Sequence, residues 1–166
     1  MTKNVSNIIV GVAALYHHGT PGTAAASIIT EVGYTEDGVT WGYSKTDVGI
    51  KVEEDTFPVK WVLTDEDVIV TCNMAEASLT NLEKAIAGAV LAGSVITIGG
   101  GAIQEFAIKI VGPAPSGGTC TIYMPYVVPA GNVSMSYRKG SKTIVPVSFK
   151  PFRNAVGATI CTVTYS

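Results

Sequence analysis

The stretch Val68-Ile69-Val70-Thr71-Cys72-Asn73-Met74 decides the fold of this chain. Its even-numbered residues are apolar, whereas Thr71 and Asn73 fall on the other side of an extended backbone. Successive side chains of a β-strand point to opposite faces, so this period of two is typical of a strand with one buried face. The sequence therefore predicts a half-buried strand here, which needs other strands as partners.

The same alternation recurs in the second half of the chain, between stretches rich in glycine and proline. It covers residues 106–110, 120–124, 133–137, 145–149 and 161–165. Short strands separated by such turns are typical of antiparallel sheets. We predict a mainly β fold, an antiparallel β-sandwich or partial barrel. Pro146 marks an edge strand or a bulge, because proline has no amide hydrogen to donate.

One α-helix is predicted to begin near Ser78 and to pack outside the sheet. Its apolar face is formed by residues at helical spacing: Leu79, Leu82 and Ile86. Ser78 or Thr80 can cap its first turn, and Thr80 with Glu83 matches a capping box. Gly88 is suited to end the helix, and we expect Asn81 on its polar face.

Residues 42–61 predict a long hairpin of two extended arms joined by the acidic turn 54–58. A hairpin of this length is hard to bury within a domain of 166 residues, so we expect it to reach toward a neighbouring subunit. The candidate inter-subunit residues are its apolar members: Val48, Ile50, Val52, Phe57, Val59 and Trp61.

The length fits one domain, residues 1–166, and the composition leaves two possibilities for its apolar residues. Hydrophobic residues make up 47% of the sequence and charged residues 14%. The charged share lies well below the usual quarter of soluble domains. Either the core is unusually large, or partner chains cover apolar surface.

The charge pattern predicts no nucleic-acid binding site. The formal net charge is −2, and the closest group of cations is Arg138, Lys139 and Lys142 around one turn. Binding to phosphates normally needs larger clusters of cations. The acidic runs at residues 53–55 and 65–67 are interpreted as solvated turns, which would also repel DNA.

The sequence offers no catalytic, metal or cofactor-binding residues, so we predict that the protein is not an enzyme and needs no cofactor. His17 and His18 are adjacent, point to opposite faces of a strand and are interpreted as an exposed strand end. The glycines at 99–101 lack the Lys-Ser/Thr ending of a phosphate-binding loop. No Gly-x-Ser-x-Gly elbow supports a serine nucleophile.

The remaining signals concern the environment of the chain. Its free cysteines lie in alternating segments and are expected to be buried thiols, as suits a reducing cytoplasm: Cys72, Cys120 and Cys161. Residues 8–15 follow a single Lys3 and favour a first strand over a signal peptide. No stretch is long enough to span a bilayer, so no membrane contact is expected.

The order of these elements resembles that of the tail tube (major tail) proteins of tailed bacteriophages. The resemblance spans most of the chain and is strongest over residues 31–86. It rests on the first strand, a recurring stretch, the acidic hairpin, the strand and helix that follow, and the C-terminal hairpins: residues 4–19, 31–40, 51–58, 67–74, 76–82, 126–137 and 143–152.

The resemblance implies a subunit that forms hexameric rings stacked into a hollow tube, with its helix outside. DNA would pass through the lumen without specific binding, and the tape measure and other tail proteins would be further partners. The protein would be assembled in the host cytoplasm and reside in the virion tail. The alternative is a β-sandwich carbohydrate- or receptor-binding module of a phage or cell surface, for which Trp41, Trp61 and the seven tyrosines would supply a platform.

Overall fold

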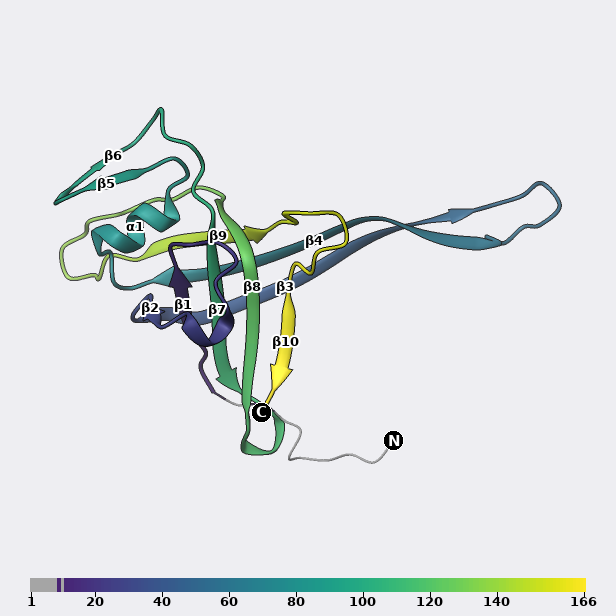
Figure 1. Ribbon diagram of the computed structural model, residues 1–166, viewed down its shortest axis with the longest axis horizontal. Coiled ribbons are helices and arrows are strands. Elements are labelled where there is room, and N and C mark those ends of the chain that lie inside the picture. The colour runs from purple at the N-terminus through teal and green to yellow at the C-terminus, as the bar shows by residue number, and fades with distance from the viewer. Residues whose placement is uncertain (1–8, 10) are drawn as a thin grey trace.

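The computed structural model describes residue 9 and residues 11–166. Ten strands, one α-helix and two 3-10 turns occur in this part of the chain (Figure 1). In chain order they are β1 (Ala14–His18), η2 (Ala25–Ser27), β2 (Thr30–Glu31), β3 (Thr35–Ile50), β4 (Lys60–Met74), α1 (Leu79–Ala85), β5 (Val90–Ala92), β6 (Val95–Thr97), β7 (Phe106–Pro113), η3 (Pro115–Gly117), β8 (Thr119–Ala130), β9 (Val145–Pro151) and β10 (Thr162–Tyr165). Residues 4–8 of the predicted first strand lie outside the described residues.

Eight strands form one antiparallel sheet in the order β2-β1-β7-β8-β9-β4-β3, with β10 also paired to β8. The long strand β8 joins two halves, because it pairs with β7 along one side and with β10 and β9 along the other. In Figure 1, β7, β8 and β10 run across the direction of β3, β4 and β9. The predicted antiparallel sandwich or partial barrel is thus confirmed, and the sheet is not closed into a barrel.

The core lies between the two halves of the folded sheet. The apolar positions that alternate along β4 are buried: Val68, Val70, Cys72 and Met74. Phe106 of β7 and Phe149 of β9 meet edge to face in the same core, with their ring centroids 5.5 Å apart. Burial of these side chains from several strands is the main force that holds the two halves together.

Helix α1 begins where its first turn is capped by Ser78, whose hydroxyl oxygen accepts a hydrogen bond from the Asn81 amide at 3.2 Å. The predicted helix is confirmed, whereas the capping box of Thr80 and Glu83 is wrong because the helix already includes Thr80. Asn81 is not on a solvated face. It is buried and donates to the Val32 carbonyl at 2.7 Å, which ties the helix to the sheet.

The strand predicted from the alternation at residues 133–137 is wrong, because no strand forms within residues 131–144. Val133 and Met135 do pack against the core, but Tyr137 is exposed. Within the described chain the segment pairs with no strand, and it carries the isolated bridge between Arg138 and Ser141. Pro146 lies where β9 pairs with β4 alone, since β8 joins β9 only from Ser148 onward, and its predicted edge-like position is confirmed.

Candidate assembly interface

The hairpin of β3 and β4 divides into a part that belongs to the body and a part that leaves it. Strand β9 covers β4 only from Val70 to Met74. Toward Lys60, the described residues provide no strand partner on that side of β4, and they provide none along the outer side of β3. We call residues 46–64, the distal part of the hairpin, the arm; it projects far beyond the body in Figure 1.

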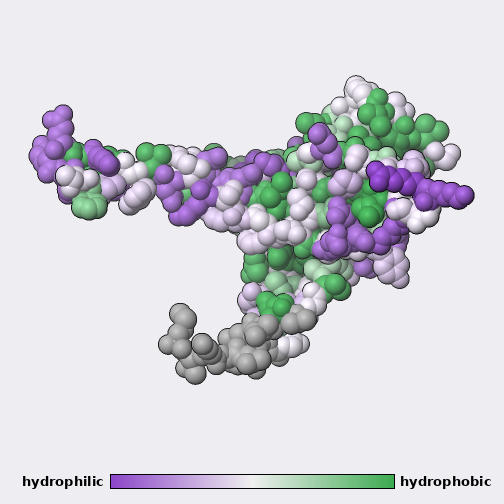
Figure 2. Space-filling view, turned by 180° about the vertical axis from the view of Figure 1, so that it is seen from behind, coloured by the Kyte–Doolittle hydropathy of each residue, from purple (hydrophilic) through white to green (hydrophobic). Residues whose placement is uncertain are grey.

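Both faces of the arm carry exposed apolar side chains. The register pairs Val48 with Val62 on one face, and Gly49 with Trp61 on the other. Trp61 is 66% exposed and Val48 is 50% exposed. Figure 2 shows that apolar and hydrophilic residues alternate along this projection. A two-stranded ribbon has no interior, so neither face is shielded from water by the rest of the monomer.

All six predicted interface residues lie in the arm with exposed side chains. Val48 and Ile50 are on β3, Trp61 is on β4, and the other three lie in the connecting loop: Val52, Phe57 and Val59. The sequence prediction did not include the exposed Val62 and Leu63, although Leu63 continues the alternation of Val59 and Trp61. That these residues contact a second subunit stays a prediction.

The loop at the end of the arm is held by hydrogen bonds. The Asp55 amide donates to the Val52 carbonyl at 3.2 Å and closes a four-residue turn. The Asp55 carboxylate accepts from the Phe57 amide at 3.1 Å, and the Val59 amide donates to Ile50 at 2.9 Å. Phe57 is nevertheless 75% exposed. The tip therefore presents an aromatic ring on a defined backbone.

A bulge at Thr64 sets which residues share a face of the arm. Asp65 pairs with Thr46 and Leu63 pairs with Asp47, which leaves Thr64 as the extra residue of β4. Its hydroxyl donates to the Thr46 carbonyl at 2.9 Å. The core-facing side of β4 consequently passes from even-numbered residues to odd-numbered ones, and Trp61 continues the face that is buried in the body.

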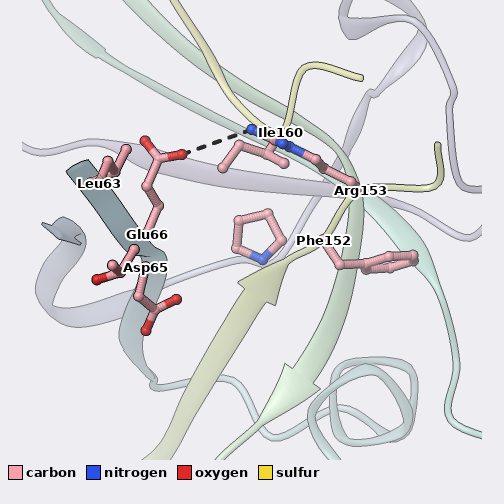
Figure 3. Close-up of a pocket in the computed structure, with 8 residues that line it drawn as sticks. Leu63, Asp65, Glu66, Phe152, Arg153 and Ile160 are labelled. Carbon is pink, nitrogen blue, oxygen red and sulfur yellow. Dashed lines mark ion pairs between the residues drawn. The ribbon is translucent and has the colours of Figure 1, made fainter. Parts of the chain in front are cut away.

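A hollow of about 320 Å³ lies at the base of the arm (Figure 3). It is lined by residues 63–66 of β4, by residues 151–153 and by Ile160. Glu66 reaches across it toward Arg153, with 3.8 Å between Oε2 and Nη2. Glu66 also accepts from the Tyr43 hydroxyl at 2.9 Å, and this hydrogen bond raises the pKa of Tyr43. Sequence reasoning missed this hollow because its two walls are far apart along the chain.

The two histidines of the pair lie on opposite faces of β1 and have different surroundings. His18 Nδ1 lies 2.9 Å from the Thr23 hydroxyl, on the opposite face from His17. The interpretation of both as an exposed strand end is wrong for His17, which is buried beside Lys84 of α1. Desolvation lowers the pKa of His17, and the nearby positive charge of Lys84 lowers it further.

The rest of the described chain offers little for chemistry. No group of three or more His, Cys, Asp or Glu side chains suited to a metal ion occurs among the described residues. Cys72 is buried, and desolvation raises the pKa of its thiol to about 11, while Cys120 and Cys161 are only half-buried. A thiol that stays protonated at neutral pH is a poor nucleophile.

Two further observations complete the description of the chain. The part that the structure describes contains no helix with the length and apolarity needed to cross a membrane. No protein-family model matches the sequence, and no curated protein matches it significantly.

Proposed function

We propose that this protein is a structural subunit that assembles with copies of itself into hexameric rings, stacked as the hollow tail tube of a bacteriophage. The single observation that carries the proposal is the arm, a two-stranded ribbon with exposed apolar side chains on both faces. An isolated two-stranded hairpin is marginally stable at best in water. An arm of this composition is best explained by a second chain that covers it.

The open ends of the sheet support self-association in particular. Strand β3 has no neighbour on its outer side among the described residues, and β2 at the other end is only two residues long. A hollow of about 650 Å³ lies between the two ends, lined by residues that include Ala14 and Val39. Unpaired strand edges attract further strands, and a closed ring of copies leaves no edge open.

Burial of the apolar surface of the arm would provide the driving force for association. Burial contributes roughly 25 cal/mol for each Å² of apolar surface removed from water. Trp61 and Phe57 are the largest of the exposed apolar side chains that would contribute to that area. Residues of these kinds are common anchors of protein interfaces.

The number of six subunits, the tube and the passage of DNA rest on the resemblance to tail tube proteins. The charge of the chain agrees with this role, because a net charge of −2 with scattered cations gives DNA little to bind. The tail of a virion would be its location, with the tape measure and other tail proteins as further partners.

Electron microscopy of the purified protein at several concentrations tests the proposal. We expect rings or tubes of uniform bore to appear as the concentration rises. A matched variant replaces residues 48–62 by Asn-Gly between Asp47 and Leu63, which pair in the native ladder. It should fold and remain dispersed. A wild-type protein that stays monomeric at every concentration and salt condition, and binds glycans, would support the carbohydrate-binding alternative.

A further inference from the structure

The outermost point of the arm is a turn with two acidic corners. Glu53 and Glu54 occupy the central positions of the turn that the Val52–Asp55 hydrogen bond closes. Both are exposed, and neither forms an ion pair with any residue that the structure describes. The carboxylate of the neighbouring Asp55 already accepts a hydrogen bond from the Phe57 amide. Two free carboxylates thus stand beside an exposed aromatic ring at the tip.

A second turn, between β8 and β9, has the opposite charge. The Ser141 amide donates to the Arg138 carbonyl at 3.3 Å, and Gly140 takes the third position with a φ of 79°. Arg138 and Lys139 are exposed and have no ion-pair partner within residues 11–166. Lys142 differs from them, because it pairs with Glu36.

This basic turn also offers a shaped surface. A hollow of about 170 Å³ lies against it, lined by Ser136, Arg138, Ser141, Lys142 and Ile144. Its lining combines two cations and two hydroxyl groups with one apolar side chain. Tyr137 stands exposed next to it. Such a surface suits a partner that presents carboxylates together with an apolar side chain.

The two turns cannot meet within one molecule. In Figure 1 the arm points to one end of the longest axis, whereas the segment between β8 and β9 curves around the other end. Figure 2, seen from behind, shows hydrophilic side chains that project from the end opposite the arm. A contact between the two turns must therefore join different copies. Because it joins unlike surfaces, it is heterologous and can propagate from copy to copy.

We propose that the acidic tip of one copy's arm docks on the basic turn of the next copy. Glu53 and Glu54 lie toward Arg138 and Lys139, and Phe57 packs on the apolar part of the hollow. This inference rests on the proposed function, since it names the surface that receives the arm when copies assemble.

Charge excludes the two simplest competing places for the tip. Contact between two arm tips would bring four like charges together, from Glu53 and Glu54 of each copy. The hollow at the base of the arm presents Asp65 and Glu66 against the single cation Arg153, so its net negative charge would also repel the tip. Exposed charge pairs contribute little free energy, so the apolar arm supplies most of the affinity while the charges select the partner surface.

Charge reversal tests the contact. A tip-reversed variant carries Glu53→Lys and Glu54→Lys, and a turn-reversed variant carries Arg138→Glu and Lys139→Glu. Each alone places like charges against each other at every contact, so we expect the assembly concentration, measured by light scattering and electron microscopy, to rise at least tenfold. Glu105→Lys, at an exposed position far from both turns in sequence, reverses one charge outside the contact and should assemble like the wild type.

Mixing the two reversed variants gives the decisive result. In an equimolar mixture each lysine tip can meet a glutamate turn, and each glutamate tip can meet a lysine or arginine turn, so assembly should return in strict alternation. Restoration by mixing cannot come from misfolding, and circular dichroism of each variant checks its fold directly. Wild-type assembly should also weaken as salt rises from 50 to 500 mM, because salt screens exposed charges.

Two results would overturn the inference, and they differ in what they leave standing. If both reversed variants assemble like the wild type, or if folded variants stay dispersed after mixing, the tip docks elsewhere while self-assembly stands. If the wild-type protein forms no rings or tubes under any condition, the contact and the proposed function fail together.

Discussion

The two parts of the β3–β4 hairpin have similar composition but opposite surroundings. Near the body, Val70 of β4 is fully buried, with 0% of its surface exposed. A few residues along the same strand, Trp61 is 66% exposed in the arm although the bulge keeps it on the continuation of the buried face. Apolar side chains at periodic positions therefore do not by themselves identify the core of the monomer. They identify apolar surface, which this chain covers in the body and which, as we propose, another copy covers in the arm.

The largest expected effect comes from comparing the same substitution, Phe→Ala, in the body and in the arm. Phe149→Ala removes a buried ring that packs on Phe106, and should lower the free energy of unfolding by about 3–5 kcal/mol. Phe57→Ala removes an exposed ring from the arm and should change it by less than about 0.5 kcal/mol in dilute monomer. Urea unfolding measures both. Equal losses would show that the arm is packed within the monomer.

Acid should act on the body rather than on the arm, through His17. Its folded pKa lies below the unfolded value, mainly because of desolvation and then because of Lys84 and His18, with Glu83 acting in the opposite direction. The unfolded state therefore binds the proton more readily, so stability is full above about pH 6.5 and falls as the pH drops through that value.

The matched variant for this prediction is His17→Leu, which keeps an apolar volume under α1. Its free energy of unfolding, measured in urea between pH 5.5 and 8, should depend less steeply on pH than that of the wild type. If the free energy of unfolding depended on pH equally in the two proteins, His17 would not couple protonation to folding. Carboxylates elsewhere in the chain contribute equally to both curves and cancel in the comparison.

Removing the N-cap of helix α1 should have a smaller effect on the stability of the body. Ser78→Ala removes the acceptor of the Asn81 amide and should cost about 1 kcal/mol of stability. Thr80→Ala, the matched control, changes a residue inside the first turn and should cost less than about 0.5 kcal/mol. Thermal unfolding of the two variants checks the difference. The reverse order would restore Thr80 as the cap.

The smallest effect is expected where the arm joins the body. The pair of Glu66 and Arg153 spans 3.8 Å, and both side chains are largely exposed. Exposed ion pairs contribute about 0–1 kcal/mol, so Arg153→Gln should leave global stability nearly unchanged. Hydrogen exchange of the amides in the arm should likewise stay within twofold of the wild type. A larger change would mean that this pair fixes the direction of the arm.

The strands and the hairpin could be predicted because period-two alternation is a local consequence of extended backbone geometry. The sequence alone could not predict that a bulge at Thr64 shifts this alternation by one residue. Apolar residues pass there from even to odd positions, and only the register shows that a bulge keeps both sets on one face. The alternation at residues 133–137 misled for a related reason, because a strand also needs a partner, and this segment pairs with no strand of the described chain.

Part of the candidate interface could likewise be predicted from the sequence, and part could not. The six apolar arm residues were identifiable from pattern and length, whereas the hollow at the base of the arm joins residues 63–66 to residues 151–153 and Ile160. Asn81 looked like a solvated helix residue, but its side-chain amide donates to the carbonyl of Val32, just after β2. Distant segments of this kind leave no periodic signal in the sequence.

The sequence by itself determined the β character, the helix after Ser78 and a hairpin too long for its own domain, because backbone period, capping and chain length act locally. The tertiary structure alone decided which apolar faces are covered, how the bulge turns the arm, and that its acidic tip and the basic turn lie at opposite ends. Those features depend on how distant strands pair, and pairing is decided by the whole sheet rather than by any single segment.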